Sequence, residues 1–170
     1  FFTKEWRANI NYGTGFRAPT FNDLYYPGYG NPAILPEKSK NTEVGLHYEK
    51  AQLESHLVIF SNSISNLIQA SSSLSCPIGT GAFGCASNVS SAKITGASLS
   101  GLAQLSSLNL KASYTQQNPV NEGSNSTLVK QAKQYGNIAG EYIYSKVTTG
   151  VGATFSGRRN DYLGDATGMG

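Results

Sequence analysis

The sequence has no apolar run that approaches the roughly 18 residues of a transmembrane helix. Charged residues make up only 14% of its 170 residues, below the roughly 25% of a typical soluble domain. The first residues also lack the ordered basic and apolar regions of a signal peptide, so we interpret the chain as an internal portion of a longer protein. Both features of the composition fit a membrane barrel whose strands alternate apolar and polar residues, and both also fit a soluble all-β protein.

Patterns that would indicate nucleic-acid, metal or catalytic chemistry are missing as well. The Lys and Arg residues are scattered and form no basic run, which gives no support to a nucleic-acid partner. His47 and His56 have no acidic residue at the spacing of a metal site, and the glycines Gly79, Gly81 and Gly84 match G-x-G-x-x-G without a βαβ context. No serine stands in G-x-S-x-G, although a Ser/His/Asp site that assembles only in space would escape this search. We expect no cofactor, no metal and no enzymatic activity.

The sequence has only two cysteines, Cys76 and Cys85. Their spacing does not match a C-x₂-C metal site and no histidine is near. A disulfide formed in an oxidising compartment fits better, and closing a ring of about ten residues would contribute about 2.7 kcal/mol in the loop-entropy model. Two free thiols are the alternative.

What the sequence does contain is repeated alternation with a period of two residues, which indicates β-strands. We expect seven strands and no helix of any length. Long polar loops alternate with short turns between the strands, as in outer-membrane barrels. The expected long loops cover about residues 18–40, 70–91 and 118–130, and the expected turns lie near residues 50–51, 106–107 and 145–146.

The placement of charges supports the same fold class. In five of the strands the mid-strand charges fall on the face opposite the apolar residues; they include Arg7, Glu43, Lys111 and Glu141. An Arg or Lys facing lipid at mid-depth would cost roughly 2–4 kcal/mol. The third strand is ambiguous because residues 57–60 are apolar throughout. Tyrosines near strand ends are typical of an aromatic girdle, and we predict an all-β, antiparallel transmembrane barrel.

The first long loop carries the candidate binding residues. Phe21, Tyr25, Tyr26 and Tyr29 are followed closely by Asn31 and are interrupted by turn residues. Aromatic side chains on a loop often present a binding surface. They can equally pack the loop onto its neighbours, and the sequence leaves both interpretations open.

Several segments resemble one known family, the TonB-dependent receptors. Residues 13–20 (GTGFRAPT) are similar to the family's strand-to-loop signature, and residues 22–25, 30–32 and 36–40 (NDLY, GNP and PEKSK) continue it in order. Residues 60–68 and 92–97 resemble the two strands that follow, and residues 130–134 (KQAKQ) are similar to a segment of the cobalamin-transporting members. The resemblance covers nearly the whole chain.

This resemblance implies a larger protein of the bacterial outer membrane that crosses it many times. The family's barrel has about 22 strands around an N-terminal plug, so residues 1–170 would be a partial barrel domain without plug or C-terminal strands. It implies active import of a scarce small molecule, energised by TonB acting through the plug, with membrane lipid as the surrounding partner. A cobalamin-like ligand leads on similarity. The Cys76–Cys85 ring departs from the cobalamin transporters, so a siderophore, haem or another metal chelate stays open. A passive porin or adhesion barrel is the remaining alternative.

Overall fold

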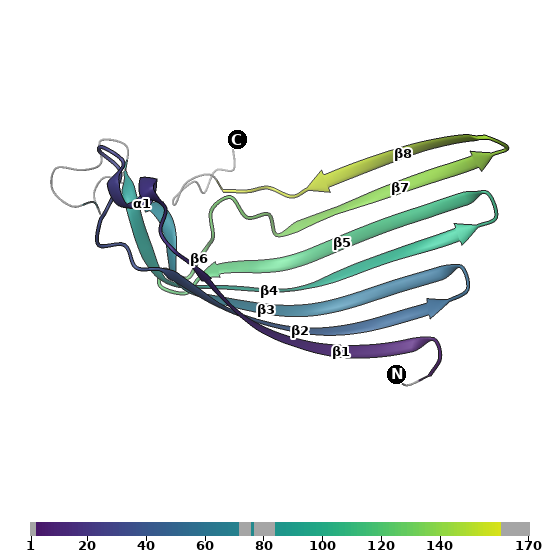
Figure 1. Ribbon diagram of the computed structural model, residues 1–170, viewed down its shortest axis with the longest axis horizontal. Helices are drawn as coiled ribbons and strands as arrows, with labels where there is room; N and C mark the ends of the chain where they lie inside the picture. The colour runs from purple at the N-terminus through teal and green to yellow at the C-terminus, as the bar shows by residue number, and fades with distance from the viewer. Residues whose placement is uncertain (1–2, 72–75, 77–83, 161–170) are drawn as a thin grey trace.

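The computed structural model describes residues 3–71, 76 and 84–160, and most of them lie in one antiparallel sheet (Figure 1). Its strands follow the order β1-β2-β3-β4-β5-β7-β8, with the short β6 paired to β5. The strands are β1 (Trp6–Arg17), β2 (Glu37–Lys50), β3 (Leu53–Ser71), β4 (Cys85–Leu105), β5 (Leu108–Asn121), β6 (Ser126–Thr127), β7 (Gln134–Tyr144) and β8 (Val147–Ser156), and one helix, α1, spans Phe21–Tyr25.

The register of the sheet resolves the ambiguous third strand. Leu57 of β3 lies opposite Leu46 of β2 and Leu99 of β4. Because side chains alternate between faces and register partners share a face, Leu57 belongs to the apolar face and its neighbour Val58 to the other. We call the face that holds Leu46, Leu57 and Leu99 the outer face, and the opposite one the inner face.

Charges sort between these faces as predicted. Arg7 pairs with His47, Glu43 with Asn11, Lys111 with Ala139 and Glu141 with Asn109, and the register places all four charges on the inner face. The central rows of the outer face carry none, which is the arrangement a lipid-facing wall requires.

The wall itself has almost no buried core. Ile10 and Val151 on the outer face are 76% and 79% exposed. Large apolar patches on soluble monomers are rare, whereas a lipid-facing wall must expose them. Among the residues that the structure describes, no helix is both long and apolar enough to cross a membrane. Strands β1 and β8 each pair with only one described strand, so the sheet is an unclosed portion of a barrel wall.

The two ends of the sheet differ, as expected. Two-residue turns at residues 51–52, 106–107 and 145–146 connect strands at one end, and each begins with a residue in the left-handed region: Ala51, Ser106 and Ser145. The longer connections and α1 gather at the other end (Figure 1). We call this the loop end.

Three expectations about the loop end were wrong in detail. β3 extends to Ser71 and β4 begins at Cys85. These two strand ends pair in register, from Leu67 opposite Val89 to Ser71 opposite Cys85, so part of the loop expected at 70–91 belongs to the sheet. β5 continues to Asn121 through the buried Pro119 and pairs with β6 inside the third expected loop. The five-residue α1 contradicts the expectation of no helix.

Candidate functional site

The candidate site is built on the first loop, residues 18–36, which we call the aromatic loop. Its helix α1 begins at a capping box in which the Thr20 hydroxyl accepts from the Asp23 backbone N–H at 3.2 Å, and the Asp23 carboxylate accepts from the Thr20 backbone N–H at 2.9 Å. Pro19 precedes the cap, where its restricted backbone favours an extended entry. Local chemistry therefore fixes the start of the helix despite its short length.

The loop folds back tightly after the helix. The Gly30 backbone N–H donates to the Tyr26 carbonyl at 2.7 Å, and the Asn31 backbone N–H donates to the Asp23 carbonyl at 2.8 Å. A Cβ at Gly30 would lie 2.6 Å from the backbone nitrogens of both Tyr25 and Tyr26. Only glycine allows this approach, so the loop is a compact unit.

An ionic network fixes the aromatic loop to the sheet. The Arg17 guanidinium of β1 lies 2.7 Å from the Glu37 carboxylate of β2 and 3.7 Å from the Asp23 carboxylate of α1. Glu37 also accepts from the Ile68 backbone N–H of β3 at 2.9 Å. Because charge-assisted bonds are stronger than neutral ones, this network ties three strands and the helix together.

The environment of Asp23 favours its charged form. The hydrogen bond from the Thr20 backbone N–H lowers the pKa of Asp23 below its ordinary value, and partial burial works against this. The Thr20 hydroxyl and the Arg17 guanidinium lower the pKa of Asp23 further. The cap and the ion pair therefore operate at neutral pH.

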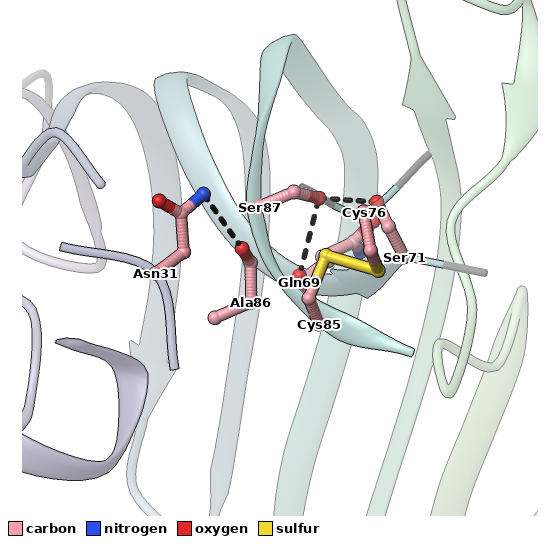
Figure 2. Close-up of a disulfide and its surroundings, with 7 residues drawn as sticks. All are labelled: Asn31, Gln69, Ser71, Cys76, Cys85, Ala86 and Ser87. Carbon is pink, nitrogen blue, oxygen red and sulfur yellow. Dashed lines mark hydrogen bonds between the residues drawn. A yellow bond between two sulfur atoms is a disulfide. The ribbon is translucent and has the colours of Figure 1, made fainter. Parts of the chain in front are cut away.

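The projecting ends of β3 and β4 form the other half of the site. A disulfide joins Cys76 to Cys85, with the two Cα atoms 5.7 Å apart, which confirms the predicted pairing. Figure 2 shows it beside the hydroxyls of Ser71 and Ser87, which hydrogen bond to each other across the two strands. Cys85 is fully buried. The disulfide thus ties Cys76 covalently to the first residue of β4, at the projecting end of the β3–β4 hairpin.

The aromatic loop packs directly on this hairpin end. The Ala86 backbone N–H donates to the Tyr29 carbonyl at 2.9 Å. Figure 2 shows the second contact, in which the Asn31 side-chain amide donates to the Ala86 carbonyl at 3.2 Å. Leu24 and Tyr29 pack against a buried cluster of Ile34, Ile68 and Ala86.

Asn88 adds a second attachment. Its side-chain oxygen accepts from the Leu35 backbone N–H at 2.8 Å, and its amide donates to the Leu35 carbonyl at 2.9 Å and to the Asn66 carbonyl at 2.8 Å. One side chain therefore reproduces a strand-like pairing between the loop and the hairpin. We call the aromatic loop together with residues 64–71 and 85–92 the loop platform.

The structure divides the five predicted binding residues into two groups. Phe21, Tyr25 and Tyr26 are 74%, 57% and 56% exposed, and the rings of Phe21 and Tyr25 lie 5.2 Å apart on α1. Tyr29 and Asn31 instead attach the loop, and burial together with the nearby Asp23 charge raises the pKa of Tyr29. Packing therefore accounts for Tyr29 and Asn31, and a binding role for the exposed group stays a prediction.

Sequence reasoning missed the residues that hold the platform. The capping box at Thr20 and Asp23 was readable as a T-x-x-D pattern. Arg17 and Glu37 lie in segments that resemble the family signature, but the contacts of Arg17, Glu37 and Asn88 could not be read from the sequence, because their partners lie on other elements.

Metal-binding groups do not gather in the described part of the chain. No cluster of three or more His, Cys, Asp or Glu side chains suited to a metal occurs there. The register does bring the two histidines together on the inner face, with the Nδ1 atoms of His47 and His56 2.8 Å apart and His47 Nε2 2.5 Å from the Asn9 side-chain oxygen. Two nitrogens alone do not form a structural metal centre of the usual four ligands.

Comparison with known proteins agrees with this architecture. The family model "TonB dependent receptor-like, beta-barrel" matches residues 1–169. The vitamin B12 transporter BtuB of Vibrio vulnificus is 31% identical over 152 residues, which cover 89% of this chain and 24% of that protein. BtuB of Photobacterium profundum is 32% identical over 160 residues, or 94% of this chain and 26% of that protein. The chain thus spans about a quarter of the length of these relatives.

Solved structures show the same fold. The ferric enterobactin receptor PfeA of Pseudomonas aeruginosa superposes with a TM-score of 0.74 at 17% identity, covering 94% of this chain and 26% of that one. The copper transporter OprC superposes with a TM-score of 0.73 at 20% identity, covering 88% and 24%. At these identities the likeness establishes architecture and leaves ligand choice open.

Proposed function

Because the chain belongs to the TonB-dependent receptor family of bacterial outer-membrane β-barrels, we propose that it forms part of the wall and mouth of an active importer. Residues 1–170 would be a partial barrel domain, and the rest of the protein would supply the plug through which TonB acts. The importer would capture a scarce small molecule outside the cell and pass it inward. The family comprises receptors and transporters, and we propose no catalytic step.

The loop platform is the observation that carries this proposal. It is held by the Arg17–Glu37 ion pair, by the hydrogen bonds of Tyr29 and Asn31 to Ala86 and by the Cys76–Cys85 disulfide. A passive pore has no need of a braced loop that exposes aromatic rings, whereas a receptor gains affinity when its binding surface is ordered before the ligand arrives. The exposed rings of Phe21, Tyr25 and Tyr26 supply such a surface.

We propose a cobalamin-like ligand. The two curated relatives above are named as vitamin B12 transporters and exceed 30% identity. Tyrosine offers a flat apolar face with a polar tip at low entropic cost, which suits a large planar macrocycle. A siderophore or haem receptor is the second candidate, because the solved relatives include a ferric enterobactin receptor. A porin or adhesion barrel ranks last.

The test uses the full-length protein with Tyr25→Ala and Tyr26→Ala combined. Each well-packed Tyr contributes on the order of 1–2 kcal/mol, so affinity for cobalamin should fall tenfold or more. The matched control is Tyr142→Ala with Tyr144→Ala, two tyrosines of the short-turn end that are also exposed.

Binding is measured by calorimetry with cobalamin, a ferric siderophore and haem, after barrel insertion has been checked by heat-resistant migration. Cobalamin binding that falls only in the Tyr25/Tyr26 variant supports the proposal. Tight binding of haem or the siderophore instead of cobalamin would transfer the assignment to that ligand. Affinity of the inserted variant within about twofold of wild type would remove the two tyrosines from the binding surface.

A further inference from the structure

The outer face changes character near the loop end. Its last apolar row holds Val44, Ile59 and Ala97, which lie opposite one another across β2, β3 and β4. The next row is polar, with Thr42 opposite Ser61. Beyond it the outer face carries three cations.

These cations are Lys38, Lys40 and Lys93, and all three are exposed. Lys40 and Lys93 both lie opposite Ser63, on either side of it, and Lys38 lies opposite Ser65. Adjacent strands are about 4.8 Å apart, so the Cα atoms of Lys40 and Lys93 are separated by about 10 Å. Two flexible ammonium groups can converge on one anion across that distance.

In the part of the chain that the structure describes, these lysines form no ion pair with a carboxylate. On the inner face, Arg17 is paired with Glu37 and Asp23. Among the described residues, no carboxylate lies within 4 Å of any of the three lysine ammonium groups. The outer face at this level therefore has a local positive charge.

A recess adjoins two of the lysines, Lys38 and Lys40. It has a volume of about 640 Å³, and most of its lining residues belong to the outer face, including Phe16, Lys38, Lys40 and Ser65. Glu122, just beyond the end of β5, also lines it. Its lining includes serine residues, Lys38, Lys40 and Phe16, while Glu122 contributes a negative charge. The recess thus offers both donors for an anion and an apolar contact.

The height of the lysines matches the edge of the membrane. Lys40 precedes the turn residue Ala51 by 11 residues, or about 36 Å along the strand. At the usual tilt of about 45° this is about 26 Å in height, close to the apolar band of about 25 Å. Lys38 and Lys93 lie two residues farther than Lys40 from the short turns of their strands. Long loops of outer-membrane barrels are extracellular, so with the loop end outside, the three lysines emerge at the height of the outer-leaflet headgroups.

We propose that Lys38, Lys40 and Lys93 bind the phosphate groups of an outer-leaflet lipid, whose acyl chains lie on the apolar row below. The chemistry is that of ammonium groups and hydroxyls donating to phosphate oxygens. The recess beside Phe16 accommodates part of the headgroup. The site is independent of the imported ligand, because it lies on the outside of the wall.

The test titrates full-length protein in neutral detergent with a diphosphorylated bacterial glycolipid, with its dephosphorylated form and with inorganic phosphate. Wild-type protein should bind the phosphorylated lipid at least tenfold more tightly than the dephosphorylated one. The variant K38Q/K40Q/K93Q should lose that preference. The control K50Q/K111Q/K146Q removes the same charge elsewhere and should stay within twofold of wild type, and K38R/K40R/K93R should retain binding.

Each other result overturns the proposal. Equal binding by the Gln variant would exclude the three lysines. Inorganic phosphate that binds as tightly as the lipid, with the same dependence on the lysines, would make the site one for free phosphate. Equal losses of lipid binding in K38Q/K40Q/K93Q and in the control would show that binding depends on net charge and not on these three lysines. Disulfide formation and heat-resistant migration verify that each variant is folded.

Discussion

Along the wall from β1 to β8, large apolar side chains such as Ile10 and Val151 point away from the protein, whereas at the loop end Ile34, Ile68 and Ala86 are buried against one another. The wall is held by strand ladders and needs lipid to cover its outer face. The loop platform has its own apolar cluster, ion pairs and disulfide. One continuous sheet thus contains a part that the bilayer stabilises and a part that stabilises itself.

The largest effect is expected when a charge is placed on the outer face of the wall, which tests whether lipid covers that face. Leu99→Lys should destabilise the full-length barrel in vesicles by roughly 2–4 kcal/mol, because an ammonium group would face hydrocarbon. Its neighbour Ser100 lies on the inner face, opposite His56 and Ser113, so Ser100→Lys is the control and should cost far less. Urea unfolding in vesicles measures both. Equal costs would contradict the assignment of the faces.

The disulfide provides the next largest effect. Cys76→Ala should remove about 2.7 kcal/mol of local stability in the loop-entropy model. The loss should appear as faster hydrogen exchange of the Ala86 and Ser87 amides, with the amides of residues 97–103 in the wall unchanged. Faster exchange throughout β4 would show that platform and wall are one cooperative unit. Oxidised wild-type protein treated with reductant is the chemical control.

Gly30→Ala tests how closely the aromatic loop must fold. The added Cβ would meet two backbone nitrogens at 2.6 Å, and overpacking of this kind typically costs about 1–3 kcal/mol. Limited proteolysis should cut residues 18–36 faster in the variant while the barrel's melting temperature stays unchanged. Gly13→Ala in β1 is the control, because its added Cβ would have no neighbour within 4 Å. Unchanged proteolysis would show that the loop adapts without loosening.

The smallest effect concerns the helix cap. Because the pKa of Asp23 is lowered in the folded protein, its charged form stabilises the loop above the ordinary Asp pKa of about 3.9, and the stabilisation is lost as pH falls below that value through the lowered pKa. Proteolysis of the aromatic loop by an acid-active protease should therefore increase below about pH 4. Asp23→Asn should cost about 1 kcal/mol at neutral pH and abolish this pH dependence. A wild-type loop unaffected by acid would exclude Asp23 as its anchor.

Much of the wall was predictable from the sequence because strand alternation is a local signal. The inner-face charges, the short turns and the apolar rows follow from residues two apart. The facing of residues 57–60 was not predictable, since both faces of β3 are apolar there and only pairing with Leu46 and Leu99 decides. The fold-back of the first loop depends on partners 55 and 53 residues away, Ala86 for Asn31 and Asn88 for Leu35. Alternation carries no information about such contacts.

The most direct test of the account is a pair of spin labels on neighbouring β5 residues of the full-length protein in vesicles. Labels at Leu110 and Lys111 report whether adjacent side chains meet lipid or water, with Val151 and Thr154 of β8 as a second pair. The account predicts oxygen-accessible, lipid-exposed labels at Leu110 and Val151, and labels shielded from lipid at Lys111 and Thr154. Water-exposed labels at Leu110 and Val151 would contradict the assignment of the outer face to lipid.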